Sequence, residues 1–224
     1  MASPGGSPPL AEPAIAEDLE LLDDLDWDDD VRLADVAVRG ASLVGRTVRG
    51  VALSGVRLTG VQLTGCTFEG ADLVDVVLDD CELSGVTLTG ARLRRVVMRR
   101  CRMSGLVAAE LHAEDVQVID SKADEAWLRM SVLDRCAFAD CDLTGSDWYR
   151  AKVAVTRFVG CRLDGSELSQ ATFDEVALHG STLDGVRGAG SLRGLVIGSD
   201  QISDVALPLF AALSIRIEDD YLDS

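Results

Sequence analysis

The chain has 224 residues, a formal net charge of −17 at pH 7, 47% hydrophobic residues and 4% aromatic residues. This length suits one or two ordinary domains, and the apolar content is ample for a core. Residues 1–16 contain neither a basic region nor a long apolar run, so we expect no signal peptide, no membrane contact and a cytoplasmic location.

Residues 1–30 differ in composition from the rest of the chain. Residues 1–16, MASPGGSPPLAEPAIA, are rich in Pro, Gly, Ser and Ala, which is typical of a disordered start. Residues 17–30 hold nine acids and no base. The apolar residues of this acidic segment are Leu19, Leu21, Leu22, Leu25 and Trp27. The segment fits two interpretations equally well, an N-terminal cap over the first repeats or a free acidic tail.

Residues 31–190 follow one five-residue pattern without insertion or deletion, which makes 32 pentads. The third position is nearly always large and apolar, and the first is small or β-branched. Arg46 is the only charged residue at a first position. A period of five fits neither a helix nor a strand, and its persistence indicates a repeat architecture. We expect first and third residues to point inward, with glycine relieving backbone strain where the chain turns.

One pentad, Ala71-Asp72-Leu73-Val74-Asp75, closely matches the consensus A(D/N)LXX, and the pattern resembles the pentapeptide-repeat family. The resemblance covers about 160 of the 224 residues. It implies an all-β fold, a right-handed quadrilateral parallel β-helix of about eight coils. Four pentads would make one coil, so that residues 20 positions apart stack directly.

Charged residues 20 positions apart alternate in sign, which agrees with this stacking. The two longest ladders are Asp75, Arg95, Asp115, Arg135 and Asp80, Arg100, Asp120. Opposite charges on neighbouring strands are mildly stabilising, whereas like charges are not.

The pattern loosens in the middle of the repeat region, where Ala108, Ala113 and Ala123 occupy third positions. Leu106 and Leu111 occupy first positions in the same stretch. We therefore expect the apolar volume to be exchanged between inward positions and the register to survive with local distortion.

The pattern stops after Gly190, so residues 191–224 form a separate C-terminal segment. Ser199-Asp200-Gln201 predicts a helix start, and Pro208 predicts a kink or two short helices that meet there. SIRIE, at 214–218, predicts a last strand, and DDYLDS is an acidic tail.

The predicted C-terminal helix has one apolar face, formed by Ile202, Val205, Ala206, Leu209 and Leu213. A helical cap over the last coil is the simpler interpretation. The alternative is a dimer contact, whose candidate residues are Val205, Leu209, Phe210 and Leu213. The segment 190–213 also resembles the terminal segment of pentapeptide-repeat proteins linked to quinolone resistance, several of which pair end to end there.

Residues suited to catalysis or metal binding are few. The six cysteines, all at inward first positions, are Cys66, Cys81, Cys101, Cys136, Cys141 and Cys161. We expect buried free thiols, although two pairs, 81 with 101 and 141 with 161, stack closely enough for a disulfide. The two histidines, His112 and His179, stand at outward positions with no partner spacing. The sequence therefore predicts no catalytic residues, no metal, no cofactor and no enzyme activity.

The resistance-linked resemblance implies a rod that imitates duplex DNA and occupies the DNA-binding saddle of type II topoisomerases such as DNA gyrase. Residues 31–190 hold 22 acids and 19 bases, so most of the negative charge lies in the ends of the chain. Duplex DNA carries about one charge per 1.7 Å, which makes the repeat region a poor electrostatic copy. Sorted by side, its charges are −2, +1, −3 and +1. The most acidic side supplies the candidate partner face: Glu82, Asp124, Glu125, Asp142, Asp164 and Asp184.

Two further groups of residues face outward. The arginine cluster comprises Arg92, Arg94, Arg95, Arg99, Arg100 and Arg102. Pairing with acids of adjacent coils explains it better than nucleic-acid binding, so we expect no direct nucleic-acid partner. Trp127, Met130 and Tyr149 form a candidate aromatic patch, with Arg129 stacked beneath Tyr149. The patch fits either a partner site or a structural Arg–aromatic stack.

The sequence thus favours a non-catalytic binding rod with a protein partner. One hypothesis is a DNA-mimicking modulator of DNA gyrase, with a possible homodimer through the C-terminal segment. The alternative is a protein interaction scaffold whose target is unrelated to DNA, which it would contact through the acidic N-terminal segment or the Trp127 patch.

Overall fold

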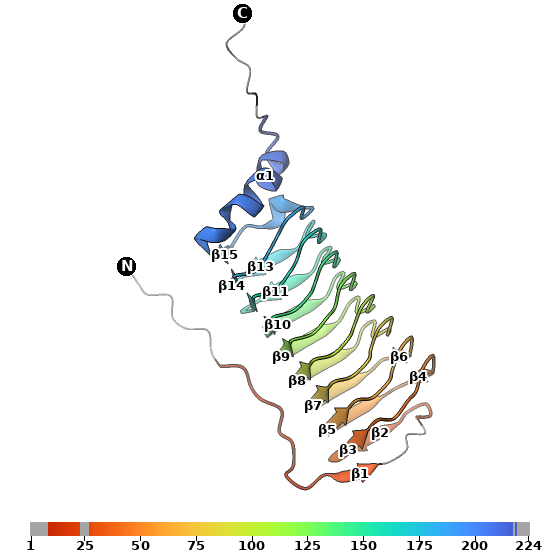
Figure 1. Cartoon of the computed structure of the whole chain (residues 1–224). Coiled ribbons are helices and arrows are strands. Elements are labelled where there is room, and N and C mark those ends of the chain that lie inside the picture. The colour runs from red at the N-terminus through yellow and green to blue at the C-terminus, as the bar shows by residue number, and fades with distance from the viewer. Residues whose placement is uncertain (1–8, 23–26, 217, 219–224) are drawn as a thin grey trace, which may run out of the picture.

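The computed structural model describes residues 9–22, 27–216 and 218. Most of the chain forms one stack of parallel coils, with the strands of successive coils side by side along the axis (Figure 1). The strands of the first half are β1 (Glu20–Leu22), β2 (Arg32–Ala34), β3 (Val36–Arg39), β4 (Thr47–Arg49), β5 (Ala52–Thr59), β6 (Thr67–Glu69), β7 (Asp72–Asp79) and β8 (Arg92–Arg99). The remaining elements are β9 (His112–Ile119), β10 (Val132–Ala139), β11 (Lys152–Ala154), β12 (Arg157–Val159), β13 (Thr172–Asp174), β14 (Val176–His179), η1 (Ala189–Ser191), β15 (Leu195–Ile197), η2 (Ser199–Gln201) and α1 (Ile202–Ala212).

Each coil has four sides of one pentad each. We number the sides from the first coil, where they begin at residues 31, 36, 41 and 46, and every later coil repeats them 20 residues on. In the five coils that contain β5, β7, β8, β9 and β10, sides 1 and 2 run on as one eight-residue strand. Sides 3 and 4 pair mostly through single bridges, such as Gln62 with Glu82 and Thr67 with Thr87.

The repeat strands pair in parallel with a displacement of 20 residues. Leu53 lies opposite Leu73, and Leu73 opposite Leu93. Extra rungs extend the stack at both ends, since β1 pairs with β3 before the first coil and β15 pairs with β14 after the eighth. The expected fold class, an all-β pentapeptide-repeat β-helix of about eight coils, is confirmed.

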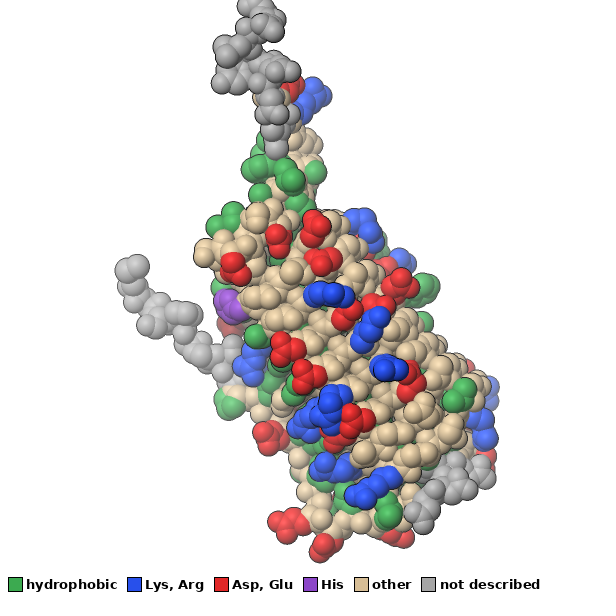
Figure 2. Space-filling view, viewed as in Figure 1, with side chains coloured by type: hydrophobic (Ala, Val, Ile, Leu, Met, Phe, Trp, Pro, Cys, Tyr) green, Lys and Arg blue, Asp and Glu red, His purple; other side chains and the backbone are tan. Residues whose placement is uncertain are grey.

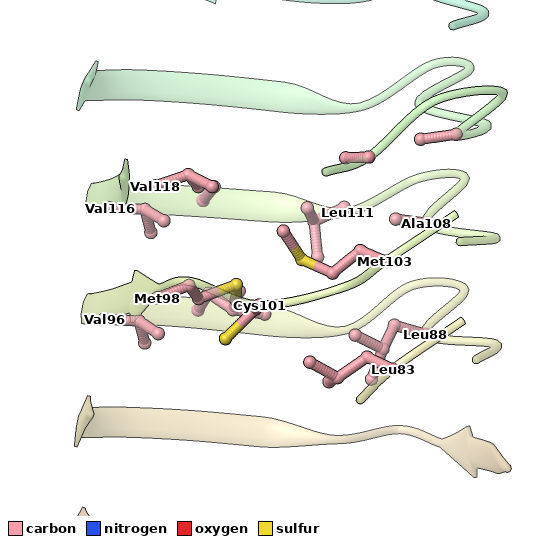
Figure 3. Packing of buried hydrophobic residues seen from close by; sticks show 14 of the residues in the cluster. Leu83, Leu88, Val96, Met98, Cys101, Met103, Ala108, Leu111, Val116 and Val118 are labelled. Atoms are coloured by element: carbon pink, nitrogen blue, oxygen red, sulfur yellow. The ribbon is translucent and has the colours of Figure 1, made fainter. Parts of the chain in front are cut away.

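The interior is filled by the first and third residues of the pentads. Val56 and Leu58 are 0% and 1% exposed, and Cys81 and Cys101 are 2% and 1% exposed. Figure 3 shows side chains of this kind from successive coils projecting into the space between the strands. Burial of each valine, leucine, phenylalanine or methionine in this column is worth about 1.5–3 kcal/mol, which makes the column the main source of stability.

The N-terminal end of the column is covered by Trp27, which is 2% exposed. Its ring centre lies 5.7 Å from that of Phe68. Arg46, the one charged first-position residue, is exposed instead of inward, and its Nη2 donates to the carbonyl of Trp27 at 3.4 Å. A charge is tolerated at this position because Trp27, and not Arg46, fills the end of the core.

The fifth residue of each pentad turns the chain. Every fifth residue from Asp30 to Gly185 has a positive φ, such as 64° at Gly60 and 56° at Asp75. An L-residue in this left-handed region costs about 1–2 kcal/mol, and aspartate tolerates it better than most. Val155, with φ 47°, is the least suited, because its branched Cβ crowds the backbone there.

The loosened stretch keeps the register, since Thr87, Val107 and Trp127 remain bridged in sequence. Leu111 is buried at 7% exposure, but Leu106 is only half-buried. An internal cavity of about 60 Å³ remains, and the alanines that line it are Ala108, Ala113, Ala123 and Ala126. The exchange of volume between inward positions is therefore incomplete.

Residues 9–16, which the sequence placed in a disordered start, form an extended strap along the stack before the chain enters β1 (Figure 1). The N–H of Ala14 donates to Asp75 at 2.9 Å, and that of Ala11 donates to Asp115 at 3.3 Å. The expected disorder of residues 1–8 lies outside the described residues. In the acidic segment, β1 and Trp27 both pack on the first coils.

The described part of the C-terminal segment contains one α-helix, and the predicted alternative of two short helices that meet at Pro208 is wrong. Pro208 lies inside α1, which runs unbroken from Ile202 to Ala212. The helix packs against the last coil through Val205, which is 7% exposed, and the half-buried Leu209. This helix is too short to cross a membrane, and no other helix of the described residues is longer and apolar enough to do so.

The last strand is not SIRIE. Within 214–218, the described residues have no strand structure, and the chain after α1 closes with a bond from the N–H of Ile215 to the carbonyl of Phe210 at 2.8 Å. The last strand is β15, which pairs Leu195 with Val176 at a displacement of 19 residues. Because β15 stands one residue out of register, the five-residue pattern does not reveal it.

Candidate protein-binding surfaces

The edge between sides 1 and 2 carries the charge ladder predicted from the sequence. Arg95 donates from Nε and Nη2 to the two carboxylate oxygens of Asp75, at 2.6 Å each. Arg135 makes the same paired contact with Asp115, at 3.0 Å each. Asp75 and Asp115 are only 9% and 7% exposed. The predicted stacking of opposite charges is therefore confirmed on this edge.

The ladder carboxylates are held ionised by their donors. The bond from Arg95 lowers the pKa of Asp75 and outweighs the opposing effect of burial, and the N–H of Ala14 lowers it further. For Asp115 burial opposes ionisation most strongly, but Arg135 and the N–H of Ala11 together bring the pKa below its ordinary value. The strap thus contributes to the charge state of both acids.

The arginine cluster is only partly engaged in pairing between coils. Arg100 bonds Asp80 at 2.8 Å, and Arg99 lies 3.7 Å from Asp79. Arg92, Arg94 and Arg102 form no ion pair with the residues that the structure describes. Ion pairing with acids therefore accounts for three of the six arginines, and the other three are exposed. Figure 2 shows acidic and basic side chains intermingled along the rod, in agreement with its small net charge.

Side 1 contains a surface hollow of about 620 Å³. Its lining includes the exposed residues Arg92 and Arg94, and His112 from the next coil. Acids also line it, namely Asp72, Glu114 and Asp134. The hollow is shallow and of mixed charge, and it belongs to the strands whose edge holds the strap.

The acidic side 3 is partly neutralised within the chain. Arg162 bonds Asp142 at 2.7 Å, and Lys122 lies 3.4 Å from Asp124. Burial opposes ionisation of Asp142, but bonds from Thr144 and Arg162 hold its pKa below the ordinary value. Four of the six candidate acids have no cation within ion-pair distance among the described residues: Glu82, Glu125, Asp164 and Asp184.

Side 4 carries the aromatic patch. Trp127 is 54% exposed and Met130 is 45% exposed, while Tyr149 is half-buried. The guanidinium of Arg129 lies 5.9 Å from the ring centres of both Trp127 and Tyr149, and also bonds Asp147 at 2.7 Å. The predicted Arg–aromatic stack is confirmed, yet it leaves half of the Trp127 surface open to a partner.

Only two of the four candidate dimer-contact residues are exposed. Val205 and Leu209 pack inside the chain, whereas Phe210 and Leu213 are 37% and 67% exposed. Leu207, which the sequence did not select, is 64% exposed on the same helix. A partner at this end would therefore meet Leu207, Phe210 and Leu213.

All six cysteines are free thiols, as expected, and four of them stack in pairs, Cys81 with Cys101 and Cys141 with Cys161. The six cysteines are buried, and burial raises the pKa of Cys136 to about 12. Thiols with such values are poor nucleophiles at neutral pH. His112 and His179 are exposed on sides 1 and 2. Within the described residues, no group of three or more His, Cys, Asp or Glu could hold a metal ion.

The strap is the feature that sequence reasoning missed. Its apolar residues Leu10, Pro13 and Ile15 are half-buried and its acid Glu12 is exposed. A Pro- and Ala-rich segment looks disordered by composition, but the alternation of apolar and exposed residues was a usable sign of an extended segment lying on a surface.

The family model for pentapeptide repeats matches the chain in eight copies, at residues 32–70, 47–80, 68–105 and 156–187. A comparison with curated protein sequences finds no match.

Solved structures with similar coils include full-length QnrB1, a plasmid-mediated fluoroquinolone resistance protein. It aligns with a TM-score of 0.46 at 20% identity, over 85% of this chain and 94% of that chain. HetL, a pentapeptide repeat protein involved in heterocyst differentiation regulation from Nostoc sp. strain PCC 7120, aligns with a TM-score of 0.30 at 16% identity, over 75% of this chain and 87% of that chain.

The repeat model, the unbroken five-residue period and the 20-residue stacking agree with one another. The chain belongs to the pentapeptide-repeat family.

Proposed function

We propose that the chain is a non-catalytic binding rod whose partner is the basic DNA-binding saddle of a type II topoisomerase such as DNA gyrase. The observation that carries the proposal is the row of unneutralised carboxylates on side 3, formed by Glu82, Glu125, Asp164 and Asp184. These acids stand on a rigid stack whose rungs are about 4.8 Å apart. A basic groove would meet them without any rearrangement of the rod.

These acids are spaced more widely along the rod than the phosphates of duplex DNA. Glu125 and Asp184 are three coils apart, which corresponds to about 14 Å along the axis. Duplex DNA presents many more phosphates over that length. Side 3 therefore resembles a sparse row of phosphates, and binding through it would depend on ionic strength because exposed charges are screened by salt.

A supercoiling assay with purified gyrase tests the proposal. The chain should inhibit supercoiling, and Glu125→Lys with Asp184→Lys should reduce the inhibition at least tenfold. Asp174→Lys with Glu175→Lys is the matched control, because it makes the same change of net charge on side 1. No inhibition over a wide concentration range, or equal loss with both double variants, would exclude side 3 as a topoisomerase-binding face.

A second candidate function is a protein interaction scaffold with a target unrelated to DNA. The exposed Trp127 and Met130 favour it, because exposed aromatic residues and methionine are enriched at protein interfaces. A pull-down with the wild-type chain should lose its partner with Trp127→Ser and keep it with Glu125→Lys. Recovery of gyrase alone would favour the first function.

A homodimer through the C-terminal end accompanies the first function. Leu207, Phe210 and Leu213 supply an exposed apolar surface at that end. Phe210→Asp with Leu213→Asp should convert a dimer to a monomer in light scattering coupled to gel filtration. Leu21→Asp, at the opposite end of the stack, should leave the mass unchanged. A wild-type monomer at high concentration would rule the dimer out.

A further inference from the structure

The strap contacts a ladder whose repeat matches its own. Asp75 and Asp115 are separated by two coils, about 9.6 Å along the axis. Ala11 and Ala14 are three residues apart, and three extended residues span about 9–10 Å. Two N–H groups three residues apart on an extended chain therefore reach two ladder positions that are two coils apart. In this ladder those positions are the aspartates, Asp75 and Asp115.

The hydrogen bonds between the ladder and the strap involve only the backbone of the strap. Only the N–H groups of Ala11 and Ala14 bond to the rod among the described strap residues. The side chains of both alanines are exposed. Each aspartate also keeps its arginine, Arg95 or Arg135, when the strap leaves. Departure of the strap would therefore leave neither buried carboxylate without a donor.

Sequence preference comes from the half-buried positions of the strap, which are Leu10, Pro13 and Ile15. The hollow of about 620 Å³ on side 1 spans the rungs of Asp115 and Asp75 and has room for further side chains of a bound peptide.

We propose that the edge between sides 1 and 2 is a binding site for an extended, proline-containing peptide, and that residues 9–16 are its resident and exchangeable occupant. A partner peptide needs N–H groups at two positions three residues apart and apolar residues next to them. The tethered strap competes with that peptide at an effective concentration of about millimolar, so the partner must displace it.

The test uses the full chain with Ala11→Pro and Ala14→Pro together. These substitutions remove both N–H donors and keep an extended backbone. Ala16→Pro is the matched control, because the N–H of Ala16 has no hydrogen-bond partner among the described residues. The probe is a fluorescent peptide with the sequence of residues 9–17, PLAEPAIAE, followed by anisotropy.

The peptide should bind the double variant at least tenfold more tightly than it binds the wild-type or Ala16→Pro chain. A peptide that carries the same two prolines should bind the double variant at least tenfold more weakly than the unsubstituted peptide does. Equal affinity for the three chains, or no binding to the double variant, would overturn the proposal. A strap that serves only as a brace would lower the stability of the double variant without any rebinding of the peptide.

Hydrogen exchange of the wild-type chain provides a second measurement that does not depend on a variant. The amides of residues 11 and 14 should exchange at least tenfold more slowly than that of residue 16, and added peptide in excess should remove this protection. Protection that persists at saturating peptide would show that the strap is not exchangeable, and absence of protection would show that it does not occupy the edge.

Discussion

Val155 offers the most direct test of how the corners determine stability. It is a β-branched residue with φ 47°, at a fifth position where glycine or aspartate is common. Left-handed backbone costs an L-residue about 1–2 kcal/mol, and strained positions range up to about 3 kcal/mol. Val155→Gly should therefore release about 2 kcal/mol of strain.

The same substitution at Val159 isolates this contribution. Val159 ends β12 and is 44% exposed, whereas Val155 is half-buried. Both variants lose some apolar burial and gain the flexibility of glycine in the unfolded chain, which costs about 0.5–1 kcal/mol. Only Val155→Gly also relieves strain, so it should be the more stable variant, by up to about 2 kcal/mol.

Urea unfolding followed by circular dichroism measures the difference, provided that the two variants have the same dependence on urea. Val155→Gly as destabilising as Val159→Gly, or more so, would refute the reasoning. Because Val155 is the more buried residue, loss of packing alone predicts the opposite order. The outcome therefore separates backbone strain from packing.

Three more outcomes are expected. Leu143→Ala should lower the free energy of unfolding, measured with urea, by about 2–5 kcal/mol, because Leu143 is 1% exposed. A loss below about 1 kcal/mol would mean that the interior collapses to fill the space left by the leucine side chain. Because Arg95 lowers the pKa of Asp75, this carboxylate stabilises the fold at pH values above the unfolded pKa of about 4, and the contribution disappears as the pH falls. Urea midpoints between pH 7 and 3 should fall less steeply for Asp75→Asn than for the wild type, and identical slopes would contradict the assignment. Trp27→Ala should speed hydrogen exchange in the first coils and leave exchange in the eighth coil unchanged, because each coil contacts only its neighbours. A uniform change along the stack would contradict this expectation.

The repeat region was determined by the sequence alone. Two inward residues in every five, repeated 32 times, leave few ways to bury the apolar side chains, and charges 20 residues apart verify the coil length. The pairing of Asp75 with Arg95, the burial of Cys81 and the stack of Arg129 on Tyr149 followed from that one period. A repeat whose coils contact only their neighbours makes tertiary structure a local problem.

The two ends were decided by tertiary structure, because no period constrains them. Composition predicted disorder for residues 9–16, but an extended segment needs only two N–H donors and a matching ladder to dock, and the ladder belongs to coils 60 to 100 residues further along the chain. Pro208 predicted a kink or two short helices, and the structure has one helix, α1, whose Val205 and Leu209 pack on the last coil. In both places, packing against a surface formed by other parts of the chain outweighed local propensity. The local sequence of the docked segment does not reveal that surface.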